Sequence, residues 1–168
     1  MEHSQNDANA REIRVVFVCT GNTCRSCMAE GVFRAIASQE APEISFTTIS
    51  RGINAYDGDP ASEHSVKALK TLWNIDISAH EAKLLKQGDF EHADLLLTMT
   101  RSHRDNLKIQ FPDRQSSIFT LKEYAYPELG RDSNELDISD PFGMPYKKYE
   151  SCAKEIFDSV KSLINKLE

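Results

Sequence analysis

Short apolar stretches alternate along this chain with longer segments in which apolar side chains recur every three or four positions. The apolar stretches span residues 13–18, 44–50, 93–99 and 117–121, and they are typical of strands, the first and third of them buried on both faces. Helical spacing begins at Ser26 and returns over residues 62–73, 101–109 and 146–167. This alternation predicts the α/β class: a single doubly wound domain with a four-stranded parallel sheet flanked by helices on both faces.

Polar and turn-forming residues mark the ends of these elements. Ser26 is available as the N-cap of the first helix, and Asp59 or Ser62 is the candidate cap of the second, behind Pro60. Residues 126–145, YPELGRDSNELDISDPFGMP, form the one long segment without a periodic pattern. Long irregular loops in compact domains are usually functional, so we expect this segment to contribute to a site.

Chain length and charge narrow the class of protein. A chain of 168 residues suits one domain, predicted over residues 13–168 behind a flexible N-terminal tail at 1–12. With 20 Lys and Arg against 26 Asp and Glu, the net charge is -6, and nucleic acid is not the expected partner. No apolar run reaches the roughly 20 residues of a membrane span, and the first residues lack an export signal. We therefore expect a cytoplasmic monomer without membrane contact.

Three of the four cysteines lie together in CTGNTCRSC, residues 19–27. In the cytoplasm, cysteines are more often reduced, catalytic or metal-bound than paired in disulfides. Cys19 ends the first strand, and the loop that follows such a strand faces the ligand crevice of an open α/β sheet. The helix dipole, the loop N–H groups and Arg25 would stabilise its thiolate, and the same groups form a cradle for a tetrahedral oxyanion. The predicted chemistry is in-line attack on phosphorus, which forms a phosphocysteine.

Such an attack needs an acid on the opposite side of the phosphorus to protonate the leaving group. Asp140, in SDPFG, is the candidate because Pro141 restricts the local backbone. Asp137 is the second choice, since nothing rigid in the sequence holds it. Phe142 is expected to form one apolar wall of the cleft, and Tyr56, in NAYDGD, the other.

The motifs CTGNTCRS at 19–26 and DPFG at 140–143 resemble those of the low-molecular-weight protein tyrosine phosphatases, and the resemblance extends from Arg14 to about Leu167. It implies that Cys19 is the nucleophile, that Arg25 clamps the phosphate, and that Asp140 acts first as the acid and then as the base. It also implies a phosphate-binding loop made of Thr20, Gly21, Asn22, Thr23, Cys24, Arg25 and Ser26.

Further roles follow from the same resemblance. Ser26 would donate a hydrogen bond to the thiolate, and Asn22, Ser50 and His80 would support the loop. Cys24 would be the redox partner that traps an oxidised Cys19 as a disulfide and protects it from irreversible oxidation.

Within that family, the chain looks more like the bacterial protein arginine phosphatases. These carry threonine at the position of Thr23, where tyrosine phosphatases usually have a bulkier apolar residue, and FTLKEY at 119–124 and Phe142 point to the same branch. The resemblance implies hydrolysis of phosphoarginine in proteins, with Thr23 and Phe142 setting specificity; a tyrosine phosphatase of the same fold is the alternative. The implied partners are phosphorylated protein substrates, with inorganic phosphate as product and inhibitor. No cofactor and no metal is implied.

Other interpretations stay open beside this one. The two cysteines of CRSC have the spacing found in half of a zinc site and in thioredoxin-like redox pairs. However, no second Cys or His pair lies at metal spacing, and neither role explains Arg25. A thiol-dependent arsenate reductase would need more downstream cysteines than Cys152, which is expected to be a buried apolar residue. A phosphate-binding module without turnover is a further class. Phe142 would alternatively be a core residue, and Cys27, where the family usually has proline, has no predicted role.

Overall fold

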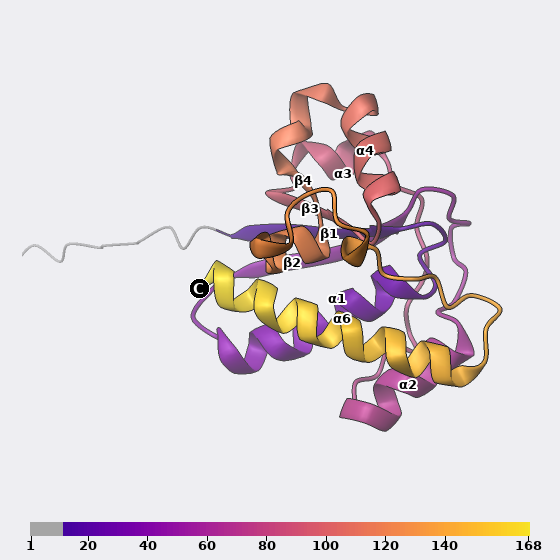
Figure 1. Cartoon of the computed structure of the whole chain (residues 1–168). Coiled ribbons are helices and arrows are strands. Elements are labelled where there is room, and N and C mark those ends of the chain that lie inside the picture. The colour runs from indigo at the N-terminus through magenta and orange to yellow at the C-terminus, as the bar shows by residue number, and fades with distance from the viewer. Residues whose placement is uncertain (1–11) are drawn as a thin grey trace, which may run out of the picture.

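The sheet at the centre of the structure has four parallel strands in the order β2-β1-β3-β4 (Figure 1). The strands are β1 (Ile13–Cys19), β2 (Phe46–Gly52), β3 (Leu95–Thr98) and β4 (Ile118–Thr120). This computed structural model describes residues 12–168, so the predicted tail at 1–12 lies, apart from its last residue, outside the described residues. The predicted α/β class with a four-stranded parallel sheet is confirmed.

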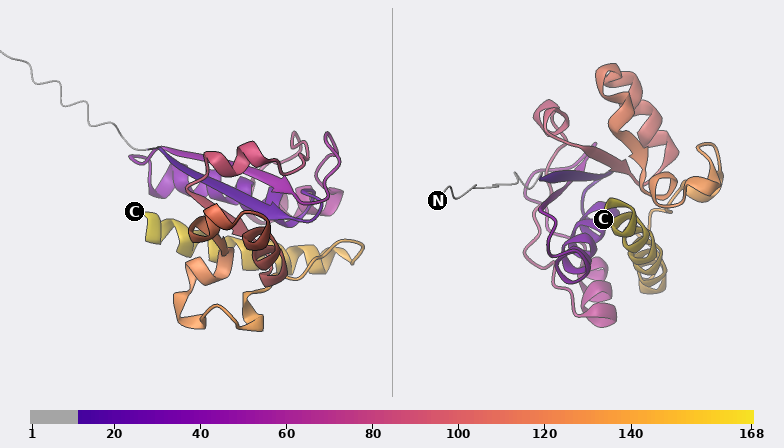
Figure 2. Two further views of the ribbon diagram at one scale, coloured as in Figure 1. Left: turned by 90° about the horizontal axis from the view of Figure 1, so that it is seen from above. Right: turned by 90° about the vertical axis from the view of Figure 1, so that its left-hand side faces the viewer.

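Helices cover the sheet on both faces (Figure 2). They are α1 (Arg25–Glu40), α2 (Glu63–Trp73), α3 (Gln87–Glu91), α4 (Arg101–Gln110), α5 (Leu121–Ala125) and α6 (Tyr146–Leu167). Short 3-10 turns span Pro112–Ser117, Pro127–Leu129 and Asn134–Leu136. The helices α1, α2 and α6 lie on one face, and α3 and α4 lie on the other. No helix within residues 12–168 is long and apolar enough to cross a membrane.

Strand β1 contributes to two separate hydrophobic cores, one on each face of the sheet. Val15 and Phe17 pack with side chains of α1 and α6, whereas Val16 and Val18 pack with Phe90 of α3 and with α4. All these strand residues are buried. A strand covered on both faces needs apolar residues at consecutive positions, which is why its sequence reads as a continuous apolar run.

Several local predictions differ from the structure. Strand β3 spans Leu95–Thr98 and is shorter than the predicted 93–99. Strand β2 begins and ends two residues later than the predicted 44–50, because its parallel ladder follows β1 to the end and pairs Gly52 with Cys19. Helix α1 begins at Arg25 with Cys24 as its N-cap, so Ser26 is not the cap; its hydroxyl is used inside the loop instead. Ser62 does cap α2, where its hydroxyl accepts a hydrogen bond from the Ser65 N–H at 3.3 Å.

The strand order places the loop between β1 and α1 at a topological switch point. From β1 the chain crosses to β2 on one side, and it later returns to β3 on the other side. In open α/β sheets, ligands bind at the carboxyl ends of the strands where the order reverses in this way. Gly52 lies directly against the loop, since a Cβ atom at this position would be 2.6 Å from the Thr20 carbonyl oxygen and 2.9 Å from the Asn22 nitrogen.

Candidate active site

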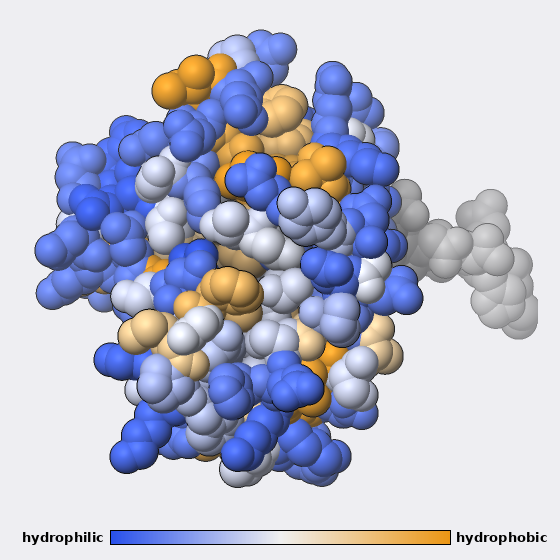
Figure 3. All heavy atoms as spheres, turned by 90° about the vertical axis from the view of Figure 1, so that its right-hand side faces the viewer, coloured by the Kyte–Doolittle hydropathy of each residue, from blue (hydrophilic) through white to orange (hydrophobic). Residues whose placement is uncertain are grey.

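A cavity of about 320 Å³ opens at the carboxyl end of β1. The residues that line it come from three segments far apart in sequence: Cys19, Thr20, Gly21, Thr23, Cys24, Arg25, Asn54, Tyr56, Asp59, Asp140 and Phe142. Figure 3 shows the side of the molecule toward which the strands' carboxyl ends point, where paler, less polar side chains gather within a mostly hydrophilic surface. Most of the residues singled out from the sequence are therefore brought together in one cavity.

The Cys19 sulfur lies among hydrogen-bond donors. It is 2.8 Å from the Ser26 Oγ and accepts a hydrogen bond from the Asn22 N–H at 3.3 Å. Ser26 Oγ also accepts a hydrogen bond from Asn22 Nδ2 at 2.8 Å, which leaves the hydroxyl hydrogen of Ser26 for the sulfur. The N-terminus of α1 follows directly after the loop. All these groups present positive charge to the sulfur, an environment that stabilises a thiolate.

Asn22 determines the shape of the loop. It adopts a left-handed conformation, with φ of 58°, and its Oδ1 accepts a hydrogen bond from the Lys83 N–H at 2.9 Å. Its carbonyl oxygen lies 2.7 Å from Nε2 of His80, which must therefore donate the hydrogen bond. Asn22, Ser26 and His80 form the hydrogen-bonded support around the loop. Ser50 does not join it, because its Oγ is buried and has no hydrogen-bond partner among residues 12–168.

Arg25 is buried and its guanidinium faces both the loop and the long irregular segment. Nη1 donates a hydrogen bond to the Ile138 carbonyl oxygen at 2.8 Å, and Nη2 lies 3.6 Å from Oδ2 of Asp140. Nε is buried and has no partner within the described part of the chain. A buried donor without an acceptor is costly, so this N–H is available to an oxyanion in the cavity.

Asp140 and Asp137 have different surroundings. Asp140 lines the cavity, its side chain is 48% exposed, and its Oδ1 accepts a hydrogen bond from the Phe142 N–H at 3.1 Å. Asp137 is paired with Arg101, whose backbone N–H and Nη2 donate at 2.8 and 3.0 Å. Burial alone would raise the pKa of Asp137, but the hydrogen bonds from Arg101 outweigh it and hold that pKa below its ordinary value. The prediction that nothing rigid holds Asp137 was therefore wrong. Arg101 holds the Asp137 side chain firmly, but this side chain does not line the cavity.

The walls of the cavity are aromatic. Tyr56 and Phe142 line it from opposite segments and are 78% and 72% exposed, so Phe142 is not a core residue. Thr23 also lines the cavity, and its carbonyl oxygen accepts a hydrogen bond from the Ser62 N–H at 2.9 Å. Asp59, which the sequence suggested only as a helix cap, instead adds a second carboxylate to the lining.

All four cysteines are free thiols and are buried. Cys24 Sγ lies 3.5 Å from the Ser62 Oγ and 3.8 Å from the Tyr149 Oη. Cys27 Sγ donates a hydrogen bond to the Cys24 carbonyl oxygen at 3.2 Å, and burial raises its pKa well above the ordinary value. Burial likewise raises the pKa of Cys152 to about 12, as suits the apolar role predicted for it. Within residues 12–168, no three His, Cys, Asp or Glu side chains are placed to hold a metal ion.

His103 was not singled out from the sequence, yet it contacts the loop. It lies in the first turn of α4, and its Nε2 is 3.2 Å from Oγ1 of Thr20. Burial, and then the positive charge of Arg25, lower the pKa of His103. The signal that could have found it is its place just after β3, since the carboxyl ends of neighbouring parallel strands lie at the same edge of a sheet.

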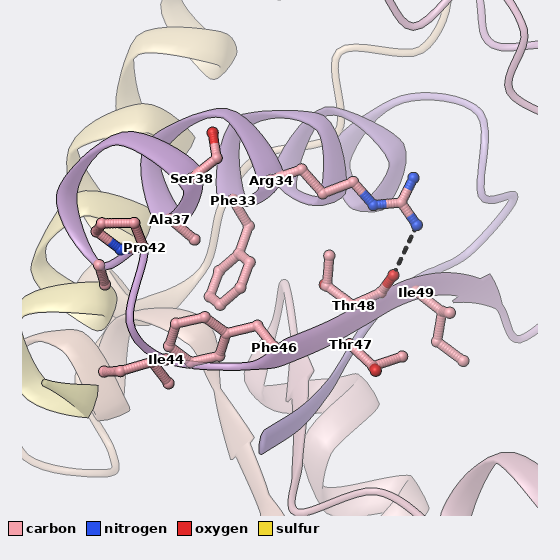
Figure 4. A pocket seen from close by; sticks show the side chains of 11 residues that line it. Phe33, Arg34, Ala37, Ser38, Pro42, Ile44, Phe46, Thr47, Thr48 and Ile49 are labelled. Carbon is pink, nitrogen blue, oxygen red and sulfur yellow. Dashed lines mark hydrogen bonds between the residues drawn. The ribbon is translucent and has the colours of Figure 1, made fainter. Parts of the chain in front are cut away.

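A second cavity, of about 410 Å³, lies between α1 and the edge strand β2 (Figure 4). Phe33 and Phe46 make it apolar, and the Arg34 Nη2 donates a hydrogen bond to the Thr48 carbonyl oxygen at 2.8 Å. No cysteine, histidine or carboxylate lines it, so the candidate chemistry stays with the smaller cavity at the loop.

The sheet order, together with a Cys-x5-Arg loop at the carboxyl end of its first strand, defines the class as a small α/β phosphatase. Residues 14–168 match the family described as low molecular weight phosphotyrosine protein phosphatase, and the chain belongs to this family. The resemblance identified from the motifs is therefore confirmed.

Relatives with two different activities are about equally similar to this chain. This chain is 35% identical over 154 residues to the protein-arginine-phosphatase of Bacillus subtilis, and the match covers 92% of this chain and 96% of the relative. It is 33% identical over 151 residues to the low molecular weight protein-tyrosine-phosphatase PtpB of Staphylococcus epidermidis, covering 90% and 96%. A crystal structure of the low molecular weight protein tyrosine phosphatase from T. tengcongensis superposes with a TM-score of 0.81 at 43% identity, covering 92% of this chain and 99% of that one. The choice between the two substrates therefore rests on the site.

Proposed function

We propose that this protein phosphatase hydrolyses phosphoarginine in proteins through a phosphocysteine intermediate. The observation that carries the proposal is the Cys19 sulfur between two hydrogen-bond donors, the Ser26 hydroxyl and the Asn22 N–H, in a cavity that Arg25 and Asp140 also line. A nucleophile, an oxyanion clamp and an acid are the three groups that phosphoryl transfer to a cysteine requires.

Each step of the proposed reaction uses a side chain of the cavity. The Cys19 thiolate attacks phosphorus, the P–N bond breaks, and the Asp140 carboxyl group gives its proton to the departing guanidine nitrogen. Asp140, now a carboxylate, takes a proton from a water molecule that attacks the phosphocysteine; the P–S bond breaks, and inorganic phosphate and the thiolate are released. Arg25 and the loop N–H groups stabilise the equatorial oxygens in both steps, so the scheme requires no metal.

Three features of the cavity support arginine as the residue that is dephosphorylated. Asp59 provides a carboxylate that attracts a cationic guanidinium group. Thr23 leaves more room at the loop than an isoleucine would, and its hydroxyl can orient the attacking water. Phe142 provides an aromatic face, on which a guanidinium group stacks favourably.

The alternative is a tyrosine phosphatase with the same catalytic groups. The names of the relatives from S. epidermidis and T. tengcongensis favour it. The two exposed aromatic side chains at the cavity would hold a phosphotyrosine ring as well as a guanidinium group.

The test is kcat/KM on phosphoarginine and phosphotyrosine peptides, measured for the parent protein and for Thr23→Ile, Thr23→Val and Thr23→Ser. We expect the parent to prefer phosphoarginine by about tenfold or more, equivalent to about 1.4 kcal/mol. Thr23→Ile should reverse the preference; Thr23→Val removes the hydroxyl at equal volume, and Thr23→Ser keeps it. A preference for phosphotyrosine in the parent and in all three variants would establish the alternative.

Cys19→Ser separates an enzyme from a phosphate-binding module. The variant should retain affinity for phosphopeptides and lose turnover, whereas turnover that survives the substitution would remove Cys19 from the mechanism.

The proposal also includes a monomeric state and a cytoplasmic location; four free thiols suit the reducing environment of that compartment. Inorganic phosphate, the product, is expected to inhibit by occupying the loop.

A further inference from the structure

One polar contact at the cavity has no part in the reaction described above. Thr20 lines the cavity directly after the nucleophile, and its Oγ1 lies 3.2 Å from Nε2 of His103. This hydrogen bond joins the phosphate-binding loop to the first turn of α4, a contact across 83 residues of sequence. Thr100 orients this turn, because its Oγ1 accepts a hydrogen bond from the backbone N–H of His103 at 3.3 Å.

The surroundings of the ring determine which atom donates. Nδ1 of His103 is buried and has no partner among the described residues. An unpaired buried N–H is rarer in proteins than an unpaired acceptor, so the ring proton belongs on Nε2. Burial, and then the guanidinium of Arg25, disfavour a second proton on the ring, while Asp140 and Asp137 favour it more weakly. The neutral ring thus donates from Nε2, and Thr20 Oγ1 accepts.

The hydroxyl hydrogen of Thr20 is consequently not used in the contact with His103. Among residues 12–168, the contact with His103 is the one hydrogen bond found for this hydroxyl group. One lone pair of the oxygen is occupied by His103, so the hydrogen is directed away from α4 by the tetrahedral geometry of the hydroxyl group. Since Thr20 lines the cavity, a water molecule can accept this hydrogen bond in the free protein, and a bound ligand can replace it.

We propose that His103 is a positioning residue, which orients the Thr20 hydroxyl so that it donates a hydrogen bond to an oxygen of the bound phosphoryl group. This inference rests on the proposed function, because it adds one donor to the same site. Thr20 is then a direct binding group, and His103 acts only through it. Inorganic phosphate presents the same oxygens as a phosphorylated side chain, so it serves as a probe of this contact without turnover.

The experiment is a double-mutant cycle with Thr20→Val, His103→Leu and the double variant, read by KM, by kcat and by the inhibition constant of inorganic phosphate. Each single substitution should weaken phosphate binding by about tenfold or more, as expected for one hydrogen bond to a charged group. The double variant should be no weaker than Thr20→Val, because His103 has no effect without the hydroxyl. His103→Gln, whose amide nitrogen can replace Nε2, should restore most of the affinity.

One control variant and one measurement of binding without turnover keep the outcomes distinct. His92→Leu removes an exposed histidine from the end of α3 and should change none of the three constants. Additive effects in the double variant, or a His103→Leu protein that loses thermal stability but keeps its phosphate affinity, would overturn the proposal. If the parent protein turned over neither phosphoarginine nor phosphotyrosine, the proposed function would fail, yet thermal stabilisation by inorganic phosphate would still measure the Thr20–His103 contact in all four proteins.

Discussion

At the scale of single residues, two aspartates three positions apart are expected to respond differently to the same substitution. Asp140→Asn removes the proton donor and should lower kcat/KM, which reports formation of the phosphocysteine and not its hydrolysis, by about 10²- to 10⁴-fold on phosphoarginine or phosphotyrosine peptides. The loss should be much smaller on an aryl phosphate with a nitrophenol leaving group, which departs without protonation. The values of kcat/KM on both kinds of substrate measure the difference; equal losses of kcat/KM on the two would mean that Asp140 is not the acid.

Asp137→Asn is the matched control. Asp137 is hydrogen-bonded to Arg101 and does not line the cavity, so the substitution should lower the free energy of unfolding and change kcat by less than about threefold. Urea denaturation together with the rate on one peptide separates the two effects. A rate loss as large as that of Asp140→Asn would mean that Asp137 is a candidate for the acid.

The sequence was informative at this scale wherever chemistry is carried by a short motif. Cys19, Arg25 and Asp140 were selected because their spacing and surroundings suit a phosphate site, and the structure places them at one cavity. His103 could not be found in this way, since its partner Thr20 is distant in sequence and nothing near it in α4 marks it. Ser50, expected from the resemblance, has a hydroxyl without a partner in the described structure.

At the scale of elements, the end of β2 determines whether the loop can take its shape. Gly52→Ala would place a Cβ atom 2.6 Å from the Thr20 carbonyl oxygen and 2.9 Å from the Asn22 nitrogen, so backbone must move. We expect kcat/KM to fall by about tenfold or more and the free energy of unfolding by about 1–3 kcal/mol.

Gly88→Ala is the control for this substitution. Gly88 lies in α3, and a Cβ atom there meets nothing within 4 Å. Replacing a helical glycine by alanine should raise stability by about 0.5–1 kcal/mol and leave kcat/KM unchanged. Circular dichroism melts and peptide kinetics on both variants test the pair, and an active Gly52→Ala protein would show that the loop tolerates the displacement.

Hydrophobic periodicity identified the four strands and the long helices of the described chain, and it placed both ends of α6 correctly, but it misplaced the ends of other elements. The predicted β2 was two residues too early because its register is set by β1, a partner whose influence is not local. Ser26 has the composition of an N-cap, yet its hydroxyl lies against the Cys19 sulfur. The short helices α3 and α5, of five residues each, are too brief to show a period.

At the scale of the whole molecule, His103 makes stability depend on pH. Burial and the charge of Arg25 lower its pKa, so on acidification the unfolded chain binds this proton before the folded protein does. The free energy of unfolding should therefore fall as the pH drops from about 7.5 to about 5.5, through the ordinary histidine pKa of about 6.5.

The measurement is urea denaturation at both pH values for the parent and for His103→Gln. The other histidines are common to the two proteins, and the paired Asp137 titrates at lower pH, so the difference in slope belongs to His103. We expect the variant to lose less stability than the parent across this window. Identical losses would show that His103 titrates alike in the folded and unfolded chains.

The contacts that hold Arg25 and Cys24 have a consequence for biosynthesis. Arg25 donates to the carbonyl oxygen of Ile138, which follows it by 113 residues, and the Cys24 sulfur lies against Tyr149, which follows it by 125. The nucleophile thus leaves the ribosome early and the groups that complete its site leave late. A growing chain carries the whole CTGNTCRS motif but remains inactive until α6 has emerged, and nascent chains stalled at successive lengths should acquire turnover only at that point.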